Sequence, residues 1–94
     1  MRRKAKTDHN QAAIVEGLRA LGCSVQNLAS QGSGCPDLLV GRGGENFLLE
    51  VKNRKGRNRV SANQKAWHAA WRGQVAIVRD VGEALRAVGF NPVV

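Results

Sequence analysis

The chain has 94 residues, of which 15 are lysine or arginine and 7 are aspartate or glutamate, so its formal net charge is +8 at pH 7. This length allows one domain with a single small core, and the excess of positive charge favours a polyanionic partner, although it does not separate nucleic acid from acidic lipid. No apolar stretch approaches the roughly 20 residues of a membrane-spanning helix, and no hydrophobic segment follows the basic N-terminus as in a signal peptide, so we expect a cytoplasmic protein.

Residues 1–6 contain four basic side chains and no apolar anchor. We expect a flexible basic arm that either contacts phosphate or only keeps the chain soluble. Residues 7–94 are expected to form the single domain. Its first helix should begin near Thr7 or Asp8, either of which can cap it, and should end at Gly22, a suitable residue for a helix C-terminus.

At about 100° per residue, the first helix places three apolar side chains on one buried stripe: Ile14, Leu18 and Leu21. Glu16 falls on the opposite side and is expected in solvent. A weak strand is expected from 24 to 28, where polar and apolar residues alternate. The two cysteines, Cys23 and Cys35, have neither the spacing of a metal site nor that of a disulfide framework, so we expect reduced thiols.

The central feature of the sequence is a predicted β-hairpin, in which apolar runs at 38–41 and 47–51 flank Gly43 and Gly44. With the turn centred on the glycine pair, the numbers of paired residues sum to 87. This register sets Asp37 directly opposite Glu50 and points Lys52 to the same face. Both faces of the hairpin are otherwise apolar, which is expected of strands covered by helices on both sides.

Two carboxylates at this separation repel each other, and one should be protonated unless a cation lies between them. A hard divalent ion such as Mg²⁺ would relieve the repulsion, because it binds carboxylate oxygens together with waters and a substrate phosphate. The alternative is a salt bridge between Lys52 and one of the acids at a sheet edge.

The segment after Lys52 is strongly basic, and its cations are Arg54, Lys55, Arg57 and Arg59. We expect this loop to bind phosphate, although short basic runs are also common as solvated loops. Ser61 and Gln64 then have the spacing of a capping box, which opens a helix that should run to about Arg72.

In that helix Gln64, Trp67 and Trp71 fall on one face, so we expect the tryptophans to pack on the sheet rather than to stack on bases. A last core strand is expected over 74–79, followed by a closing helix over 81–88 that Asp80 caps. The expected order is therefore helix, three strands, helix, strand, helix.

Pro36-Asp37 followed by Glu50-Val51-Lys52 resembles the signature of the PD-(D/E)XK nucleases. The closer resemblance is to the small stand-alone, phage-type domains of the virus-type replication-repair nucleases (VRR-NUC). It extends over nearly the whole chain and rests on an ordered set of motifs: Asn10-Gln11 at a helix start, a glycine before Pro36-Asp37, Glu50-Val51-Lys52, the basic loop, Gln64 at a helix start and Val78-Arg79 in a strand. The resemblance implies an α/β fold with a restriction-endonuclease-like core of order αβββαβ(α), in which helices flank a mixed sheet.

For the site, the resemblance implies that Asp37, Glu50 and the backbone carbonyl of Val51 bind Mg²⁺ or Mn²⁺, while Lys52 and Gln64 assist hydrolysis of a phosphodiester. Gln11 would hold a phosphate or a metal-bound water. The family places a further acid near the start of the first helix, where this chain has Thr7. Asp8 is either its substitute as a metal ligand or only a helix cap.

For the partners, the resemblance implies a homodimer that cleaves branched DNA, preferably four-way (Holliday) junctions, in the bacterial host of a phage. Three alternatives stay open: a nuclease that acts on flaps or nicked duplex, a non-catalytic DNA-binding module with the same fold, and an RNA-binding protein. The last would expose aromatic side chains for base stacking, and this chain has only four aromatic residues of the Phe, Trp and Tyr types.

Overall fold

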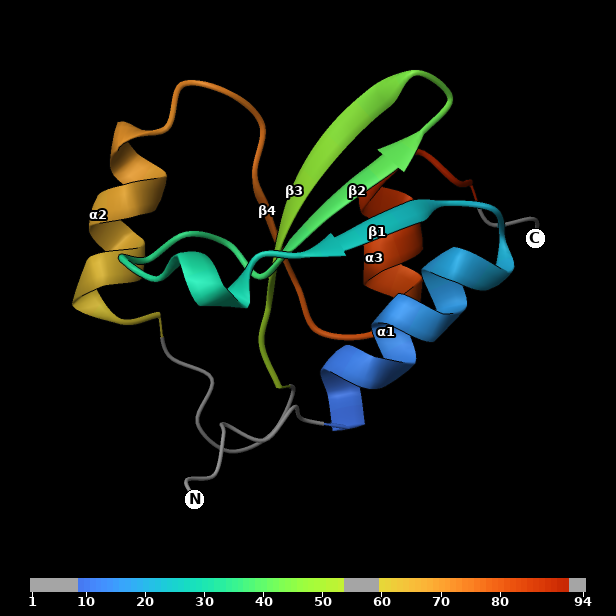
Figure 1. The fold of residues 1–94 in the computed structure, drawn as a ribbon, viewed down its shortest axis with the longest axis horizontal. Coiled ribbons are helices and arrows are strands. Elements are labelled where there is room, and N and C mark those ends of the chain that lie inside the picture. Colours follow the sequence, from blue (N-terminus) through green and yellow to red (C-terminus); the bar gives the residue numbers. More distant parts are fainter. Residues whose placement is uncertain (1–8, 54–59, 92–94) are drawn as a thin grey trace.

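A four-stranded sheet, in the order β1-β2-β3-β4, runs through the computed structural model, which describes residues 9–53 and 60–91 (Figure 1). Along the chain the elements are α1 (His9–Ala20), β1 (Ser24–Asn27), the short 3₁₀ helix η1 (Ala29–Gln31), β2 (Leu38–Arg42), β3 (Glu45–Val51), α2 (Ala62–Ala70), β4 (Ala76–Val78) and α3 (Val81–Ala87). The strands β1, β2 and β3 are antiparallel, and β4 is parallel to β3. The predicted mixed α/β fold and its order of elements are confirmed, with η1 as an unpredicted addition.

The β2-β3 hairpin has the register predicted from its sequence. Leu39 pairs with Leu48 and Gly41 with Asn46. The turn glycines have φ values of 59° at Gly43 and 83° at Gly44, a conformation that other residues adopt only at a cost. The glycine pair therefore fixes the register, and the register decides which side chains reach the site.

The hydrophobic core lies on one face of the sheet, where α1 and α3 pack side by side (Figure 1). Its buried members are Ile14, Leu18, Cys23, Leu38, Val40, Leu49, Val78, Ala84 and Val88. The contact between the two helices is close at Gly17, where a β-carbon would lie 2.6 Å from a methyl group of Val81. Alternation along β2 and β3 sends the intervening side chains, including Glu50, to the other face.

Helix α2 lies apart from this core and away from α1 and α3 (Figure 1). None of its residues is buried, and Trp71, which follows its last turn, is 44% exposed. The prediction that both tryptophans pack on the sheet is therefore wrong for Trp71. The helix ends at Ala70 and the chain turns away at Trp71, so the helical periodicity no longer describes where that ring points.

A second correction concerns Leu21, which was expected on the buried stripe of α1 and is 53% exposed. The helix ends at Ala20, and the chain then turns through Gly22, whose φ is 91°. The amide of Gly22 donates to the Arg19 carbonyl, and the amide of Cys23 donates to the Leu18 carbonyl. These bonds satisfy the last carbonyls of the helix and turn Leu21 outward.

The predicted caps of the two later helices are present. Ser61 and Gln64 form the capping box of α2, and the Asp80 side chain accepts from the amide of Glu83 at the start of α3. No helix within residues 9–53 and 60–91 is long and apolar enough to cross a membrane. The predicted basic arm, 1–6, lies outside the described residues.

The loop that leads to Asp37 is packed against the start of α2. Gly34 has a φ of 84°, and a β-carbon on it would overlap the backbone carbonyl of Asn63. This glycine therefore serves two purposes, since it allows a left-handed backbone and also lets two segments approach each other closely.

We expect Gly34→Ala to lower the free energy of unfolding by roughly 3 kcal/mol or more, because strain at positive φ adds to a clash between backbones. Gly22→Ala is the matched control, since Gly22 also has positive φ but has no atom within 4 Å of a built β-carbon. It should cost only about 1–2 kcal/mol. Urea unfolding followed by circular dichroism measures both values, and equal losses would contradict the close approach at Gly34.

Candidate metal and nucleic-acid site

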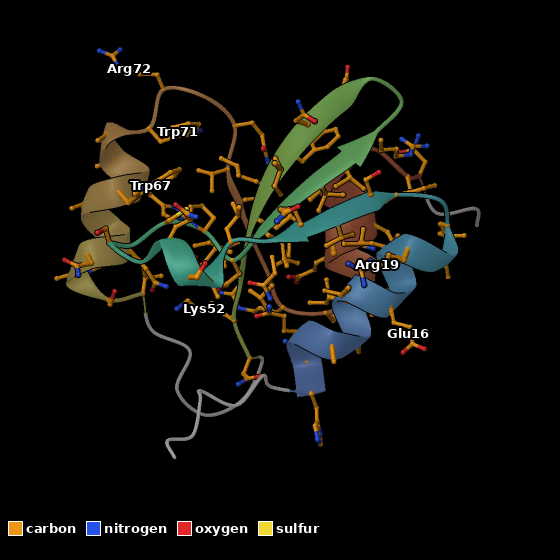
Figure 2. All side chains as sticks on the ribbon, viewed as in Figure 1. Glu16, Arg19, Lys52, Trp67, Trp71 and Arg72 are labelled. Atoms are coloured by element: carbon orange, nitrogen blue, oxygen red, sulfur yellow. The ribbon has the colours of Figure 1, made fainter. Side chains whose placement is uncertain are left out.

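The structure brings five of the predicted site residues together at one end of the sheet. Asp37 directly precedes β2, Glu50 and Val51 end β3, Lys52 follows β3, and Gln64 lies in the first turn of α2. Figure 2 shows Lys52 between the end of β3 and the start of α2. The hairpin and the capped helix α2 thus supply the candidate site from segments that are far apart in sequence.

Glu50 is the buried centre of this cluster and is only 1% exposed. Its Oε2 accepts a hydrogen bond from Gln64 Nε2 at 2.7 Å and lies 3.6 Å from Lys52 Nζ. Its Oε1 is buried and has no hydrogen-bond partner among residues 9–53 and 60–91. An unsatisfied buried oxygen is costly, and it is the type of donor atom that a hard divalent cation binds.

The pKa of Glu50 is raised from its ordinary value of 4.5 to about 8. Burial is the main cause, because it disfavours the charged form. The negative charge of the neighbouring Asp37 carboxyl raises the pKa further, and Lys52 opposes the shift. At neutral pH Glu50 therefore retains its proton in the absence of another cation, which agrees with the repulsion expected from the sequence.

Asp37 extends the pairing of β2 and β3 through its side chain. The last ladder pair at this end joins Leu38 to Leu49. Beyond it, Asp37 Oδ2 accepts from the amide of Val51 at 2.8 Å, while the backbone carbonyl of Asp37 accepts from the amide of Leu28 at 2.8 Å. These bonds hold the Asp37 carboxylate beside the end of β3 and next to Glu50.

Lys52 is fixed by both its backbone and its side chain. Its amide donates to the Val78 carbonyl at 3.0 Å, and its Nζ donates to Gln64 Oε1 at 2.8 Å. Gln64 Oε1 also accepts from the amide of Ser61 at 3.0 Å. The glutamine that completes the capping box of α2 therefore also connects Lys52 to Glu50, so the helix start and the site are built from the same side chain.

Asn10 is a site residue whose function the sequence did not predict. Its Nδ2 donates to the Lys52 carbonyl at 2.9 Å and to the Arg79 carbonyl at 3.1 Å. One amide thus joins the start of α1 to the ends of β3 and β4. The Asn10-Gln11 pair at the helix start was the only signal in the sequence, and it did not indicate which carbonyls the side chain would reach.

Gln11, predicted to hold a phosphate or a metal-bound water, lies in a different environment. It lines an open hollow of about 410 Å³ whose other residues are Ala12, Val15, Glu16, Arg19 and Asn27. Glu16 is exposed there, as predicted (Figure 2). Within the described residues the Gln11 side chain makes no hydrogen bond, so the structure does not bring its amide into the cluster around Glu50.

The remaining predicted site residues are Asp8, Arg54, Lys55, Arg57 and Arg59, and all of them lie outside the described residues. Within 9–53 and 60–91 no cluster of three or more His, Cys, Asp or Glu side chains could hold a metal ion. The carboxylates of the cluster at the end of the sheet are those of Asp37 and Glu50, and the backbone carbonyl of Val51 directly follows Glu50. Two carboxylates and a carbonyl fit Mg²⁺ or Mn²⁺, which complete their coordination with water and phosphate.

The thiol of Cys35 lies close to these carboxylates. Its pKa is raised, first by burial and then by the negative charges of Glu50 and Asp37. The thiol is therefore protonated at neutral pH, whereas a cysteine must lose its proton to bind a metal. Both cysteines are free in the structure, so the predicted reduced thiols are confirmed.

The raised pKa of Glu50 predicts a specific dependence of stability on pH in the presence of EDTA. Between about pH 5 and about pH 8 the folded chain retains a proton that the unfolded chain has lost, so its stability falls as the pH rises. Melting temperatures across this range should therefore decline. The isosteric variant Glu50→Gln, which cannot ionise, should show a flatter profile, and parallel profiles for the two proteins would contradict the shift.

Comparison with solved structures finds a chain described as a "VRR_NUC domain", with a TM-score of 0.63 and 27% sequence identity over 83% of this chain and 88% of that chain. No family model matches the chain, and no curated protein does. The match supports a nuclease domain, and PD-(D/E)XK is the known fold of that family. The resemblance predicted from the sequence is therefore confirmed: the chain has the fold and the sequence likeness of a VRR-NUC domain in the PD-(D/E)XK superfamily.

Proposed function

We propose that the chain is a metal-dependent, structure-selective DNA endonuclease that hydrolyses phosphodiester bonds in four-way junctions. The observation that carries this proposal is the buried Glu50 carboxyl, which has one unsatisfied oxygen and lies beside Asp37 and Lys52. A buried acid with a strongly shifted pKa and an adjacent lysine is typical of a reactive site. A purely structural ion pair would leave no buried carboxylate oxygen without a partner.

Asp37, Glu50 and the backbone carbonyl of Val51 are the groups that would hold Mg²⁺ or Mn²⁺. When bound, such an ion neutralises charge on the scissile phosphate and lowers the pKa of a bound water. The contribution of the chain is to keep the two carboxylates adjacent and partly dehydrated. Two ionised carboxylates this close repel each other, and without a cation this repulsion is relieved by protonation of Glu50. A divalent cation would relieve it while both groups stay ionised, so the arrangement favours binding of such a cation.

Lys52 is the group that meets the reacting phosphate and water. Its ammonium is held by Gln64 Oε1 at 2.8 Å, so it is oriented before substrate arrives. From this position it orients the attacking water or takes a proton from it, or it stabilises the charge that develops on the phosphate oxygens. By resemblance to the family, in-line attack leaves a 5′-phosphate and a 3′-hydroxyl.

The proposed substrate is argued from the positive charge of the chain and from the symmetry of a dimer. The net charge of +8 and the basic residues of the segment 54–59 would supply contacts to phosphate, which carry no base sequence information. Cleavage would therefore depend on the shape of the DNA. A two-fold homodimer would present two sites to a nearly two-fold four-way junction. The bacterial host of a phage, which the family resemblance implies, is the location that we propose for this reaction.

The first test measures cleavage of a labelled four-way junction in Mg²⁺ or Mn²⁺, beside duplex and flap substrates. We expect paired symmetric nicks in the junction. Asp37→Asn and Lys52→Ala should each reduce the rate at least about 100-fold, because each removes a group that acts on the reacting phosphate. Lys65→Ala is the control for loss of one positive charge, since Lys65 is exposed on α2.

Each outcome of this test separates one part of the proposal from the rest. Binding without any cleavage, unchanged by Asp37→Asn, would reject the enzyme and leave a DNA-binding module. Cleavage restricted to flaps would keep the chemistry and reject the junction preference. Cleavage that continues in excess EDTA would contradict the proposed requirement for a divalent metal ion.

A second test separates the two functions of Gln64. Ser61→Ala removes the cap of α2 and should cost about 1 kcal/mol of stability, while the Gln64 side chain can still bond Glu50 and Lys52. Gln64→Ala removes both of these bonds and should lower kcat by roughly tenfold or more by releasing Lys52. Equal kcat losses in the two folded variants would mean that Gln64 only caps the helix.

A further inference from the structure

Two tryptophans form an exposed aromatic stack near the C-terminal end of α2. The ring centroids of Trp67 and Trp71 are 4.6 Å apart, and the ring planes lie within 19° of parallel. Trp67 covers one face of the Trp71 ring, yet Trp71 remains 44% exposed. Part of the Trp71 side chain is therefore open to solvent. Figure 2 shows both rings along α2, with Arg72 extending outward beyond them.

The Trp71 ring is held in place rather than freely mobile. Its Nε1 donates to the Gln74 carbonyl at 3.2 Å. The Gln74 side chain in turn bonds both backbone groups of Leu48, accepting from its amide at 2.7 Å and donating to its carbonyl at 3.2 Å. The ring is thus linked to the edge of β3. A flat surface fixed in advance loses little conformational entropy when a ligand binds.

The position of the stack relative to the site is set by α2. Gln64, in the first turn, bonds Glu50 and Lys52, and Trp71 follows seven residues later. Along the helix axis, Gln64 and Ala70, the residue before Trp71, lie about 9 Å apart at 1.5 Å per residue. This distance corresponds to about three nucleotides of a DNA strand at 3.4 Å each.

We propose that Trp71, supported by Trp67, is a stacking platform for a base of the substrate DNA that has left its helical stack, about three nucleotides from the phosphate at Asp37 and Glu50. Arg72 would contact the adjacent backbone phosphate. Aromatic rings bind any base in this way, because every base has a π face. A continuous duplex offers no free base face, whereas a branch point or an unpaired segment does, so the platform selects branched DNA.

This inference rests on the proposed function, because it takes DNA as the partner, but it is tested by binding rather than by cleavage. The chain has only two tryptophans and no tyrosine, so its intrinsic fluorescence reports on this stack. In EDTA, with intact DNA verified on a gel, a four-way junction and a single-stranded oligonucleotide should quench the fluorescence strongly. A continuous duplex of equal length should quench it weakly.

Substitution of the ring tests the contact directly. Trp71→Ala should weaken binding of the junction and of single-stranded DNA by roughly tenfold, and binding of duplex by less than about twofold. Trp71→Phe, which keeps a smaller stacking surface, should fall between Ala and the natural residue. Leu21→Ala is the matched control, since Leu21 is an exposed apolar side chain at the end of another helix. Arg72→Ala should weaken binding of all three DNAs similarly. It should also reduce the slope of log K against log salt concentration by the amount expected for about one phosphate contact.

Three results would overturn the platform. The first is equal quenching by duplex and junction, and the second is a Trp71→Ala variant that binds both as the natural protein does. The third is a fall in molar mass by light scattering in Trp71→Ala, which would mean that a second copy of the chain covers the stack. If Trp71→Ala does not fold, Trp71→Phe and the quenching of the natural protein decide the question. Selective quenching without any cleavage would support the stacking platform and contradict the proposed nuclease activity. Cleavage without selective quenching would support the nuclease activity and contradict the stacking platform.

Discussion

The burial of one carboxyl group, that of Glu50, is the constraint on which the rest of the site depends. A carboxylate side chain is rarely buried unless it is paired or bound to a metal. Only one of the two carboxylate oxygens of Glu50 is paired here. Gln64 and Lys52 interact with Oε2, while Oε1 has no partner in the part of the chain that the structure describes. Asp37 places a second carboxyl group beside that of Glu50. The fold therefore holds a charge imbalance that protonation relieves in isolation and that a divalent cation would relieve more completely.

The sheet separates stability from chemistry by its two faces. The face covered by α1 and α3 holds the apolar core, and the alternation of side chains sends Glu50 to the other face. Asn10 connects the two regions, since it starts in the core helix α1 and bonds the carbonyls of Lys52 and Arg79 at the strand ends. The end of a strand, rather than a flexible loop, thus positions Lys52, which is the arrangement that its proposed catalytic role would require.

The parts of this structure that local rules govern could be predicted from sequence. The glycine pair at the hairpin turn and the alternation of apolar residues determined the register, which in turn brought Asp37 to Glu50. Capping chemistry identified the starts of α2 and α3. The errors at Leu21 and Trp71 have one cause, because each residue lies just beyond a helix end, where the helical period no longer applies. The bonds of Asn10 span 42 and 69 residues, and no local pattern encodes contacts at that separation.

The attachment of α2 connects the chemistry of Glu50 to the aromatic stack. The helix has no fully buried residue, so contacts at its two ends contribute to fixing its position. It is held at its start by Gln64 and by the close approach of Gly34 to Asn63, and just after its end by the link from Trp71 through Gln74 to β3. A change at Glu50 therefore acts directly on one of the few contacts that place the helix. Because Trp71 follows the same helix, the group that would bind the metal and the ring that would receive a base belong to one mechanical unit, and their spacing is set by the length of α2.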